Sequence, residues 1–282
     1  MAFMINTNIA ALTAQRSLSN TTNALSATFK RLSSGLRINS ASDDAAGLSI
    51  SDRMTSQIRG FNQSVRNAND TISLIQVAEG ALNETTTALQ RMRELSVAAA
   101  NDTYVTTDRT DMQKELNQLV AEIQRISSNT QFNNQYLLQG SFAEGKRFHV
   151  GANTDQTIVV SITDMGAEAL GIDAGNLEVF NTGDGATDQA NAEAAITKID
   201  NAINSVTSMR ATMGAMQNRF QAAIASLTNI SLNTEAAKSR VLDADMAAES
   251  AKLTQNSILQ QAGTAILAQA NQQPSVILQL LR

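Results

Sequence analysis

The feature that most constrains this chain of 282 residues is a three–four alternation of apolar residues along four long segments. A repeat near 3.5 residues gives a helix one apolar row, the seam of a left-handed coiled coil. The rows are Leu18, Leu25, Phe29, Leu32 and Leu36; Ile75, Ala78, Leu82, Leu89 and Met92, with Thr85 and Ser96 in phase; Met112, Leu116, Leu119, Ile123 and Ile126; and Ile196, Ile199, Ile203, Val206, Met213, Phe220, Ile224 and Leu227, with Arg210 and Gln217 in the remaining positions. At about 1.5 Å per residue the last row alone predicts a helix of roughly 50 Å.

The composition favours the same architecture. Pro274 is the only proline, so almost nothing interrupts a helix. Aromatic residues make up 4% of the chain and tryptophan is absent. The core must therefore be filled by Ala, Leu, Ile, Val and Met, which suits slender helix–helix packing. Because the four rows lie far apart in sequence, we expect the N-terminal and C-terminal thirds to pair with each other.

The middle of the chain has a different pattern. From about residue 140 to 185 glycine becomes frequent and the helical period disappears. Thr157–Ile162 has the β-branched content of a strand, and Phe148–Val150 and Leu177–Phe180 are weaker strand candidates. Gly151–Asn153 and Gly183–Gly185 are typical of turns. We therefore expect two short β-hairpins, at about 140–185, capping the helical bundle.

Both ends of the chain lack charge. Residues 253–281 exceed the length of a membrane span, but they contain nine Asn and Gln side chains, which hydrocarbon disfavours. We therefore expect no membrane insertion. The first fifteen residues are also uncharged, with Ile5, Ile9 and Leu12 at helical spacing. Either the two ends form a self-contained antiparallel helical hairpin, or other copies of the chain cover them.

No group of residues predicts catalysis, a metal site or a cofactor. Asp43 and Asp44 are adjacent, so they do not face each other on a helix; Ser42 is a candidate helix cap beside them. His149 stands alone without cysteine and is expected to be structural, and no calcium-loop pattern surrounds Asp243 and Asp245. We therefore expect no enzyme activity.

The charge balance predicts no nucleic-acid partner. The net charge is −5, and the first acidic residue is Asp43. Four cations precede it, namely Arg16, Lys30, Arg31 and Arg37. Four cations over some forty residues are more typical of a solvated helix face than of a DNA-binding arm. A DNA-packaging or coiled-coil regulatory protein is accordingly disfavoured.

Several long blocks of the sequence resemble bacterial flagellins. They are Ile5–Leu12, Arg31–Arg53, Arg66–Leu82, Asn129–Asn133, Val241–Lys252 and Gln261–Leu281. The resemblance covers about residues 1–140 and 190–282, in order. It implies a mainly α fold, a long coiled-coil-like helical bundle with paired N- and C-terminal segments and a small β-hairpin region. Residues 1–40 and 240–282 would form a terminal helical domain, and residues 41–239 a helical bundle domain. Large variable outer domains, present in many flagellins, are absent.

The resemblance implies a structural subunit that self-assembles into the bacterial flagellar filament for swimming motility. A hook–filament junction protein is the alternative. The residues implied in subunit packing are Ile5, Ile9, Leu12, Leu25, Phe29, Leu32, Leu259, Ile266, Ile277 and Leu280. The implied partners are other copies of the chain, the flagellar export chaperone, the type III export apparatus, and hook-associated and cap proteins. The implied location is the extracellular filament.

One further block resembles the flagellin segment recognised by the vertebrate Toll-like receptor for flagellin. It is Leu89–Ser96, in which Gln90, Arg91 and Leu95 match the motif, together with Glu115 in Met112–Glu115. The same surface contributes to subunit packing in the family. Packing is therefore the first hypothesis for this block, and receptor recognition the second.

Overall fold

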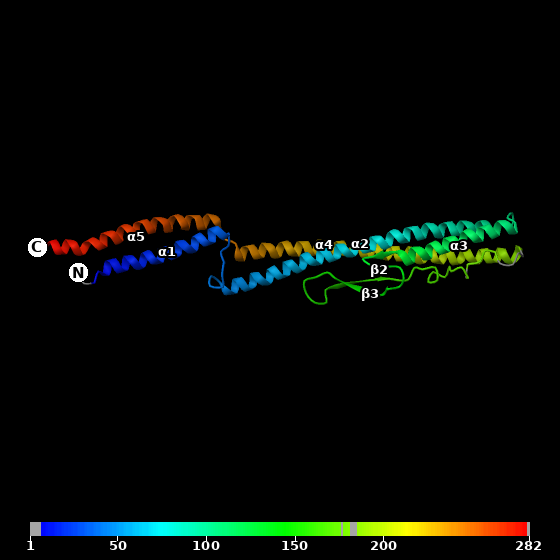
Figure 1. Cartoon of the computed structure of the whole chain (residues 1–282), viewed down its shortest axis with the longest axis horizontal. Helices are drawn as coiled ribbons and strands as arrows, with labels where there is room; N and C mark the ends of the chain where they lie inside the picture. The colour runs from blue at the N-terminus through cyan, green and yellow to red at the C-terminus, as the bar shows by residue number, and fades with distance from the viewer. Residues whose placement is uncertain (1–6, 176, 181–184, 281–282) are drawn as a thin grey trace. The chain divides into compact units, whose positions relative to one another are not determined.

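The computed structural model describes residues 7–175, 177–180 and 185–280, without the side chains of 185–186 and 273–280. Five helices and four short strands occupy these residues (Figure 1). In chain order they are α1 (Ile9–Ser34), α2 (Ala45–Ala99), α3 (Thr106–Asn129), β1 (Gln131–Phe132), β2 (Gln135–Tyr136), β3 (Phe142–His149), β4 (Thr157–Ile162), α4 (Gly185–Leu242) and α5 (Met246–Leu280). The predicted mainly α fold with paired termini and a small β region is confirmed. None of the described helices is long and apolar enough to span a membrane.

The chain divides into two compact units. The first consists of residues 1–58 and 232–282, and the second of residues 59–231. α2 and α4 contribute residues to both units. The division at residues 40 and 240 that the resemblance implies stays a prediction.

In the first unit, α1 and α5 lie side by side and run antiparallel (Figure 1). Gly35 ends α1 in the left-handed conformation, with φ of 71°, and its N–H donates to the Arg31 carbonyl. The chain then forms a short antiparallel bridge, Leu36 opposite Asp243. The Arg37 N–H donates to the Leu242 carbonyl over 2.7 Å, and the Ala244 N–H donates to the Gly35 carbonyl over 2.9 Å. The segments that leave α1 and enter α5 are thus hydrogen-bonded to each other.

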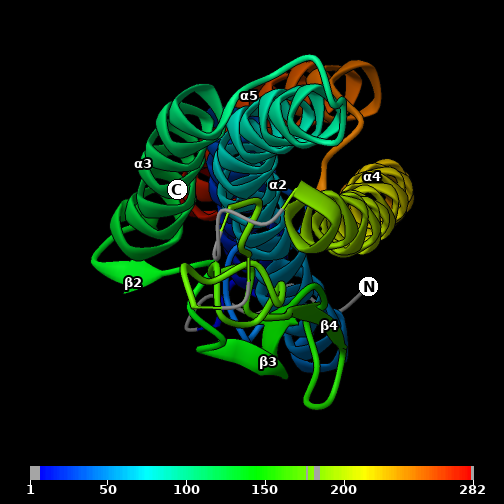
Figure 2. The same cartoon turned by 90° about the vertical axis from the view of Figure 1, so that its right-hand side faces the viewer.

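In the second unit, α2, α3 and α4 lie beside one another with the strands on one side (Figure 2), and the main hydrophobic core includes residues of all three helices and of β3 and β4. The predicted seam of α2 is confirmed, because its members are at most 1% exposed: Ile75, Ala78, Leu82, Thr85, Leu89, Met92 and Ser96. α4 contributes Ile199, Val206, Met213 and Phe220 to the same core. In α3, Leu116 and Ile123 are fully buried, whereas Leu119 and Ile126 are only half-buried beside Val120.

The two hairpins differ in part from the expectation. The strand predicted at Thr157–Ile162 is confirmed and pairs antiparallel with β3, with His149 opposite Thr157. The β1–β2 hairpin at residues 131–136 was not expected. The β3–β4 hairpin does not cap the bundle but lies along α2, where the Ser64 hydroxyl donates to the Gly151 carbonyl over 2.7 Å and the Asn67 amide donates to the His149 carbonyl.

The strand predicted at Leu177–Phe180 is wrong. Leu177 and Val179 are buried, as in a strand, but no neighbouring strand pairs with them among the described residues. The Gln113 side chain of α3 takes that place: its amide N–H donates to the Leu177 carbonyl, and its oxygen accepts from the N–H groups of Val179 and Phe180.

Candidate packing surface on the terminal helices

The helices α1 and α5 contact each other through a coiled-coil seam of small and polar residues. The less exposed positions of α1 follow the three–four alternation through Ala11, Ala14, Leu18, Thr21, Leu25, Thr28 and Leu32. Those of α5 follow it through Glu249, Leu253, Asn256, Gln260, Gly263, Leu267 and Ala270. Small residues let the two backbones approach closely, but they bury little apolar area per turn.

Phe29 does not belong to this seam, which corrects the sequence-based assignment. It is 64% exposed, whereas Thr28 beside it is 5% exposed. Either residue fits a three–four alternation between Leu25 and Leu32. Thr28 can be buried because its hydroxyl donates to the Ala24 carbonyl over 2.9 Å, so no polar atom is left without a partner.

Three contacts define the register of the pair. Near the start of α1, the Asn8 amide donates to the Ala270 carbonyl over 2.7 Å. Farther along, Leu18 packs beside Gly263, where an added Cβ would lie 3.4 Å from its methyl group. Near the other end, Arg31 pairs with Glu249. The three pairs, Asn8 with Ala270, Leu18 with Gly263 and Arg31 with Glu249, agree with a single antiparallel register to within one helical turn.

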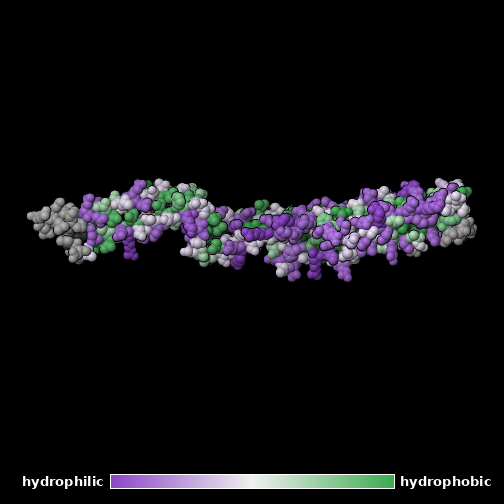
Figure 3. Space-filling view, in the orientation of Figure 1, coloured by the Kyte–Doolittle hydropathy of each residue, from purple (hydrophilic) through white to green (hydrophobic). Residues whose placement is uncertain are grey.

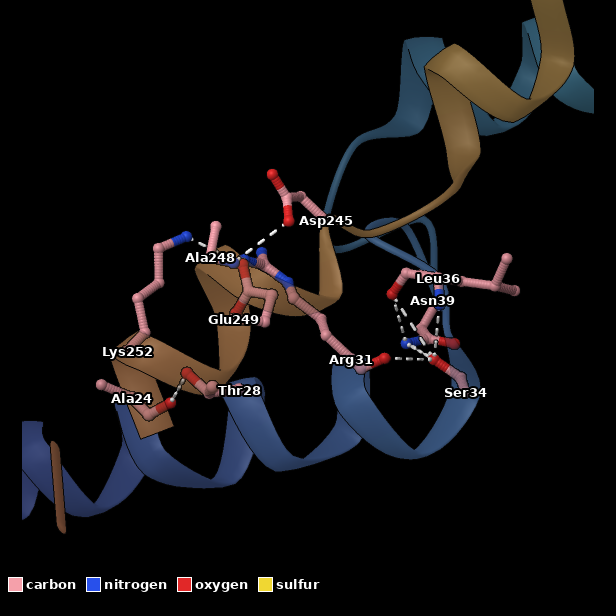
Figure 4. A network of polar contacts seen from close by, with 10 residues as sticks. All are labelled: Ala24, Thr28, Arg31, Ser34, Leu36, Asn39, Asp245, Ala248, Glu249 and Lys252. Carbon is pink, nitrogen blue, oxygen red and sulfur yellow. Dashed lines mark hydrogen bonds and ion pairs between the residues drawn. The ribbon is translucent and has the colours of Figure 1, made fainter. Parts of the chain in front are cut away.

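Glu249 is the one buried acidic side chain of this seam among the described residues (Figure 4). Its carboxylate lies 2.8 Å from the Lys252 ammonium and 3.6 Å from the Arg31 guanidinium, while its second oxygen has no hydrogen-bond partner. Removing one partner of such a pair leaves a charge with poor solvation, so a slipped register that separates Glu249 from Arg31 is disfavoured.

The outer faces of both helices leave large apolar side chains uncovered. On α1 these include Ile9, Leu12 and Phe29, and on α5 they include Ile258, Leu259 and Ile266, each between 48% and 64% exposed. Figure 3 shows apolar surface over these helices. Around Phe29, the residues Leu25, Ser26, Lys30, Ser33 and Ser34 line a depression of about 520 Å³. Six large apolar side chains at this exposure make the pair a candidate surface for contact with other chains.

The residues expected to pack between subunits therefore fall into three groups. Ile9, Leu12, Phe29, Leu259 and Ile266 lie on the exposed outer faces. Leu25 and Leu32 are half-buried in the seam with α5. Ile5 and the side chains of Ile277 and Leu280 lie outside the described residues.

The second candidate surface lies on α2 and α3. Arg91 and Glu115 come together, with Nε to Oε1 at 2.9 Å, and Arg91 also pairs with Glu94 at 3.1 Å. These hydrogen bonds, first to Glu115 and then to Glu94, raise the pKa of the Arg91 guanidinium. Gln90 is exposed, whereas Leu95 is buried, at 6% exposed. Of the four motif residues, Gln90, Arg91 and Glu115 are thus accessible to a partner protein, and Leu95 is not.

The remaining polar candidates have structural roles. Asp44, not Ser42, caps α2, because its carboxylate accepts from the Gly47 N–H over 2.9 Å. Asp43 accepts from the Ser40 hydroxyl and from the N–H groups of Asn39 and Ser40. These bonds, chiefly that from the Ser40 hydroxyl, lower the pKa of the Asp43 carboxyl.

The last acidic candidates and the histidine also take part in the fold. Asp245 caps α5 by accepting from the N–H groups of Ala247 and Ala248, and Asp243 accepts from the Ser239 hydroxyl. His149 ends β3 as an exposed residue. No group of three or more potential metal ligands occurs within the described part of the chain.

Sequence reasoning missed two structural residues. For Glu249 the sequence contains one indication of its role, because it is the last acidic residue before the long charge-free stretch. Its partner Arg31 lies far away in the sequence, near the other end. Gln113 gave none: it lies in a helix with many polar residues, and its role depends on a segment more than 60 residues away.

The comparisons with known proteins cover both ends of the chain. The protein-family model for the bacterial flagellin N-terminal helical region matches residues 5–143, and the family model for the bacterial flagellin C-terminal helical region matches residues 196–281. The chain is 47% identical to a flagellar filament 33 kDa core protein of Treponema phagedenis, over 99% of this chain and 100% of that protein. It is 46% identical to a flagellin of Bacillus subtilis, over 99% of each.

One solved structure shares the fold. It is named for a flagellar hook-associated protein from Vibrio parahaemolyticus, and the TM-score is 0.55 at 18% sequence identity. The match covers 71% of this chain and 100% of that one. At this identity the likeness extends to the fold alone.

Proposed function

The chain belongs to the bacterial flagellin family, and from that premise we propose that it is a structural subunit of a flagellar filament whose outer terminal-helix faces pack against other copies. The similarity to filament core proteins along the whole chain carries this proposal. The family is one of structural proteins, and the residues described here offer no group that suggests catalysis.

The chemistry of the terminal helices supports the placement of the subunit contacts. Ile9, Leu12, Phe29, Leu259 and Ile266 are exposed, and α5 carries no charged residue from Leu253 onwards. A neighbouring helix can bury this part of α5 without desolvating a charge, and its Asn and Gln side chains can hydrogen-bond across the contact. A hook–filament junction protein is not favoured, because the full-length relatives are flagellins and filament core proteins.

The proposal extends to the route by which the chain reaches the filament. We propose that it is exported through the flagellar type III apparatus, that a chaperone covers α5 beforehand, and that cap and hook-associated proteins meet the same terminal helices in the extracellular structure. The exposed apolar residues Ile258, Leu259 and Ile266 support a need for such cover before assembly.

Recognition by a Toll-like receptor is the second function proposed, for the surface around Arg91. Gln90 and Arg91 are exposed, Arg91 pairs with the partly exposed Glu115, and Leu95 is buried. A receptor reporter assay with monomeric protein would test it: Arg91→Ala should lower the response, and Lys114→Ala, one residue from Glu115 and paired only with Asp111, should not.

Electron microscopy of seeded assembly tests the filament proposal. Purified protein is mixed with short filament seeds, intact or truncated before residue 253. Long filaments of uniform width are expected from the intact chain, and none from the truncated one. An intact chain that stays monomeric or stops at short rings would indicate a junction protein instead.

Point variants test where the contacts lie. Ile266→Asn exchanges an exposed apolar side chain of α5 for an amide, so it should slow or abolish growth while the circular dichroism of the monomer stays unchanged. Thr264→Ala, an exposed position two residues away on another face, is the matched control. Equal growth rates for both variants would remove the outer face of α5 from the assembly contact.

A further inference from the structure

The long helices α2 and α4 each contain, far from their ends, a glycine that close packing does not require. At Gly47 and Gly60 an added Cβ would come within 2.8 Å of a neighbouring atom, so close approach explains those glycines. At Gly80 and Gly214 it would meet nothing within 4 Å. A helix-interior glycine in open space lowers helix stability, because it widens the backbone freedom of the unfolded chain and removes a side chain.

Gly80 and Gly214 lie at the same level of the antiparallel pair. Next to Gly80, the Glu79 carboxylate accepts from the Gln217 amide over 2.7 Å, and Gln217 is one helical turn from Gly214. On either side, Arg93 pairs with Asp200 at 2.7 Å, and Ser231 with Asn62 at 3.5 Å. These three pairs share one antiparallel register to within a helical turn, and in that register Gly80 lies opposite Gly214.

The core at this level combines the fully buried Leu82 with methionines and alanines. α4 presents Met209, Met213 and Met216, and α2 presents Ala78 and Ala81, all within or against the main core. Methionine is unbranched and repacks with little cost, whereas the neighbouring core positions of α4 hold the stiffer side chains of Phe220 and the β-branched Val206. We call residues 78–82 of α2 and 209–217 of α4 the glycine level.

We propose that the glycine level is a compliant joint at which α2 and α4 bend together while the rest of the second unit keeps its packing. Bends in long helices concentrate at residues such as glycine, where the backbone loses the restraint of a side chain. One glycine would make one helix bend against a straight neighbour. With a glycine in each helix at the same level, both helices can bend together. The adjacent methionines can repack, and the polar side-chain pairs on either side hold α2 and α4 in register.

Spin-label distances in the monomer test this directly, since the chain has no cysteine of its own. Thr197→Cys and Thr228→Cys place labels at exposed positions of α4 on either side of Gly214, about 46 Å apart along a straight helix. The distance distribution should narrow when Gly80→Ala and Gly214→Ala are introduced together. Amide exchange at the glycine level should slow by about 2–5-fold for each alanine.

A relocated glycine provides the matched control. Gly214→Ala with Ala225→Gly keeps the composition and moves the glycine about three turns, to an exposed position beyond Phe220. This variant should give a distribution as narrow as Gly214→Ala alone. The proposal is overturned if the relocated variant is as broad as the wild type, or if the double alanine variant leaves the width unchanged.

A filament assembly assay distinguishes this bending role from a second explanation, in which the glycines allow another copy of the chain to approach closely. If the alanine variants keep the wild-type distance width but no longer extend filament seeds, the glycines serve contact between copies and the joint is rejected. The spin-label arm needs only the monomer, so it stands or falls independently of the filament proposal.

Discussion

At the scale of single residues, the clearest expectation concerns Gly60, where α2 meets the loop that joins β3 to β4. An added Cβ would lie 2.8 Å from the Cβ and 3.1 Å from the Cα of Ala152, and the loop is tied down by the bond from Ser64 to Gly151. Gly60→Ala should therefore destabilise the second unit by about 1–3 kcal/mol. Chemical denaturation followed by circular dichroism measures this.

The control is Gly80→Ala in the same helix, where the new methyl group meets nothing within 4 Å. It should stabilise the protein by about 0.5–1 kcal/mol. If both alanines shift the unfolding midpoint in the same direction, the close approach of Ala152 to α2 is not what requires glycine at position 60.

Asp43 gives a prediction about pH. Its pKa is lowered, chiefly by the hydrogen bond from Ser40, so the ionised form stabilises the turn before α2. The contribution of a group with a lowered folded-state pKa is complete above its unfolded pKa of about 3.9 and is lost as pH falls through the folded value. In an NMR titration, Ser40→Ala should move the pKa of Asp43 up toward 3.8, and no change would mean that the two backbone N–H groups suffice.

At the scale of elements, α3 holds the chain that follows it through side chains instead of strand pairing. Gln113 binds Leu177 and Val179, the Gln124 side-chain oxygen accepts from the Ala167 N–H, and the Ser127 hydroxyl donates to the Leu138 carbonyl. Side chains on one face of α3 thus supply the hydrogen-bond partners that a neighbouring strand would supply to these irregular segments.

Gln113→Ala should release residues 177–180 from α3. It leaves the Leu177 carbonyl and the Val179 N–H without partners at a largely buried site, which costs about 1–3 kcal/mol. Amide exchange at Val179 should accelerate by at least tenfold. Gln113→Glu is the informative control: it keeps the acceptor for Val179 and loses only the donor to Leu177, so exchange at Val179 should change less.

The helices and the principal strand could be predicted because each leaves a local periodic signal. The strand at Thr157–Ile162 matches to the residue, and the α2 seam is buried throughout. Phe29 was misplaced because two phases fit the same alternation, and only the hydrogen bond of Thr28 explains why the polar residue is inside. The segment 177–180 has the alternating apolar residues of a strand, but this pattern does not show whether a strand or a side chain pairs with its backbone. Here the Gln113 side chain does so.

At the scale of the whole molecule, the two units differ in what holds them together. The second unit buries large side chains such as Leu82, Leu89, Phe142 and Phe220 completely. In the α1–α5 seam of the first unit the leucines are only half-buried, and most of the other positions hold Ala, Gly, Thr or amides. Less apolar area leaves the water per residue, so the terminal pair should be the less stable part.

Hydrogen exchange of the monomer measures that difference. Amides of α1 and α5 should exchange at least a hundredfold faster than those of the α2 segment Ile75–Leu89, and should become protected in seeded filaments. The exchange of Ile75–Leu89 should change little on assembly. Equal protection of both regions in the monomer would mean that the terminal pair is stable without neighbours.

The antiparallel pairing of α1 with α5 also sets an order of events in time. The bond between Asn8 and Ala270 joins residues 262 positions apart, so α1 is synthesised long before the helix it pairs with. Contacts of such sequence separation form slowly, because a long loop must close before any of them is made. During synthesis α1 therefore leaves the ribosome well before α5 can cover its seam.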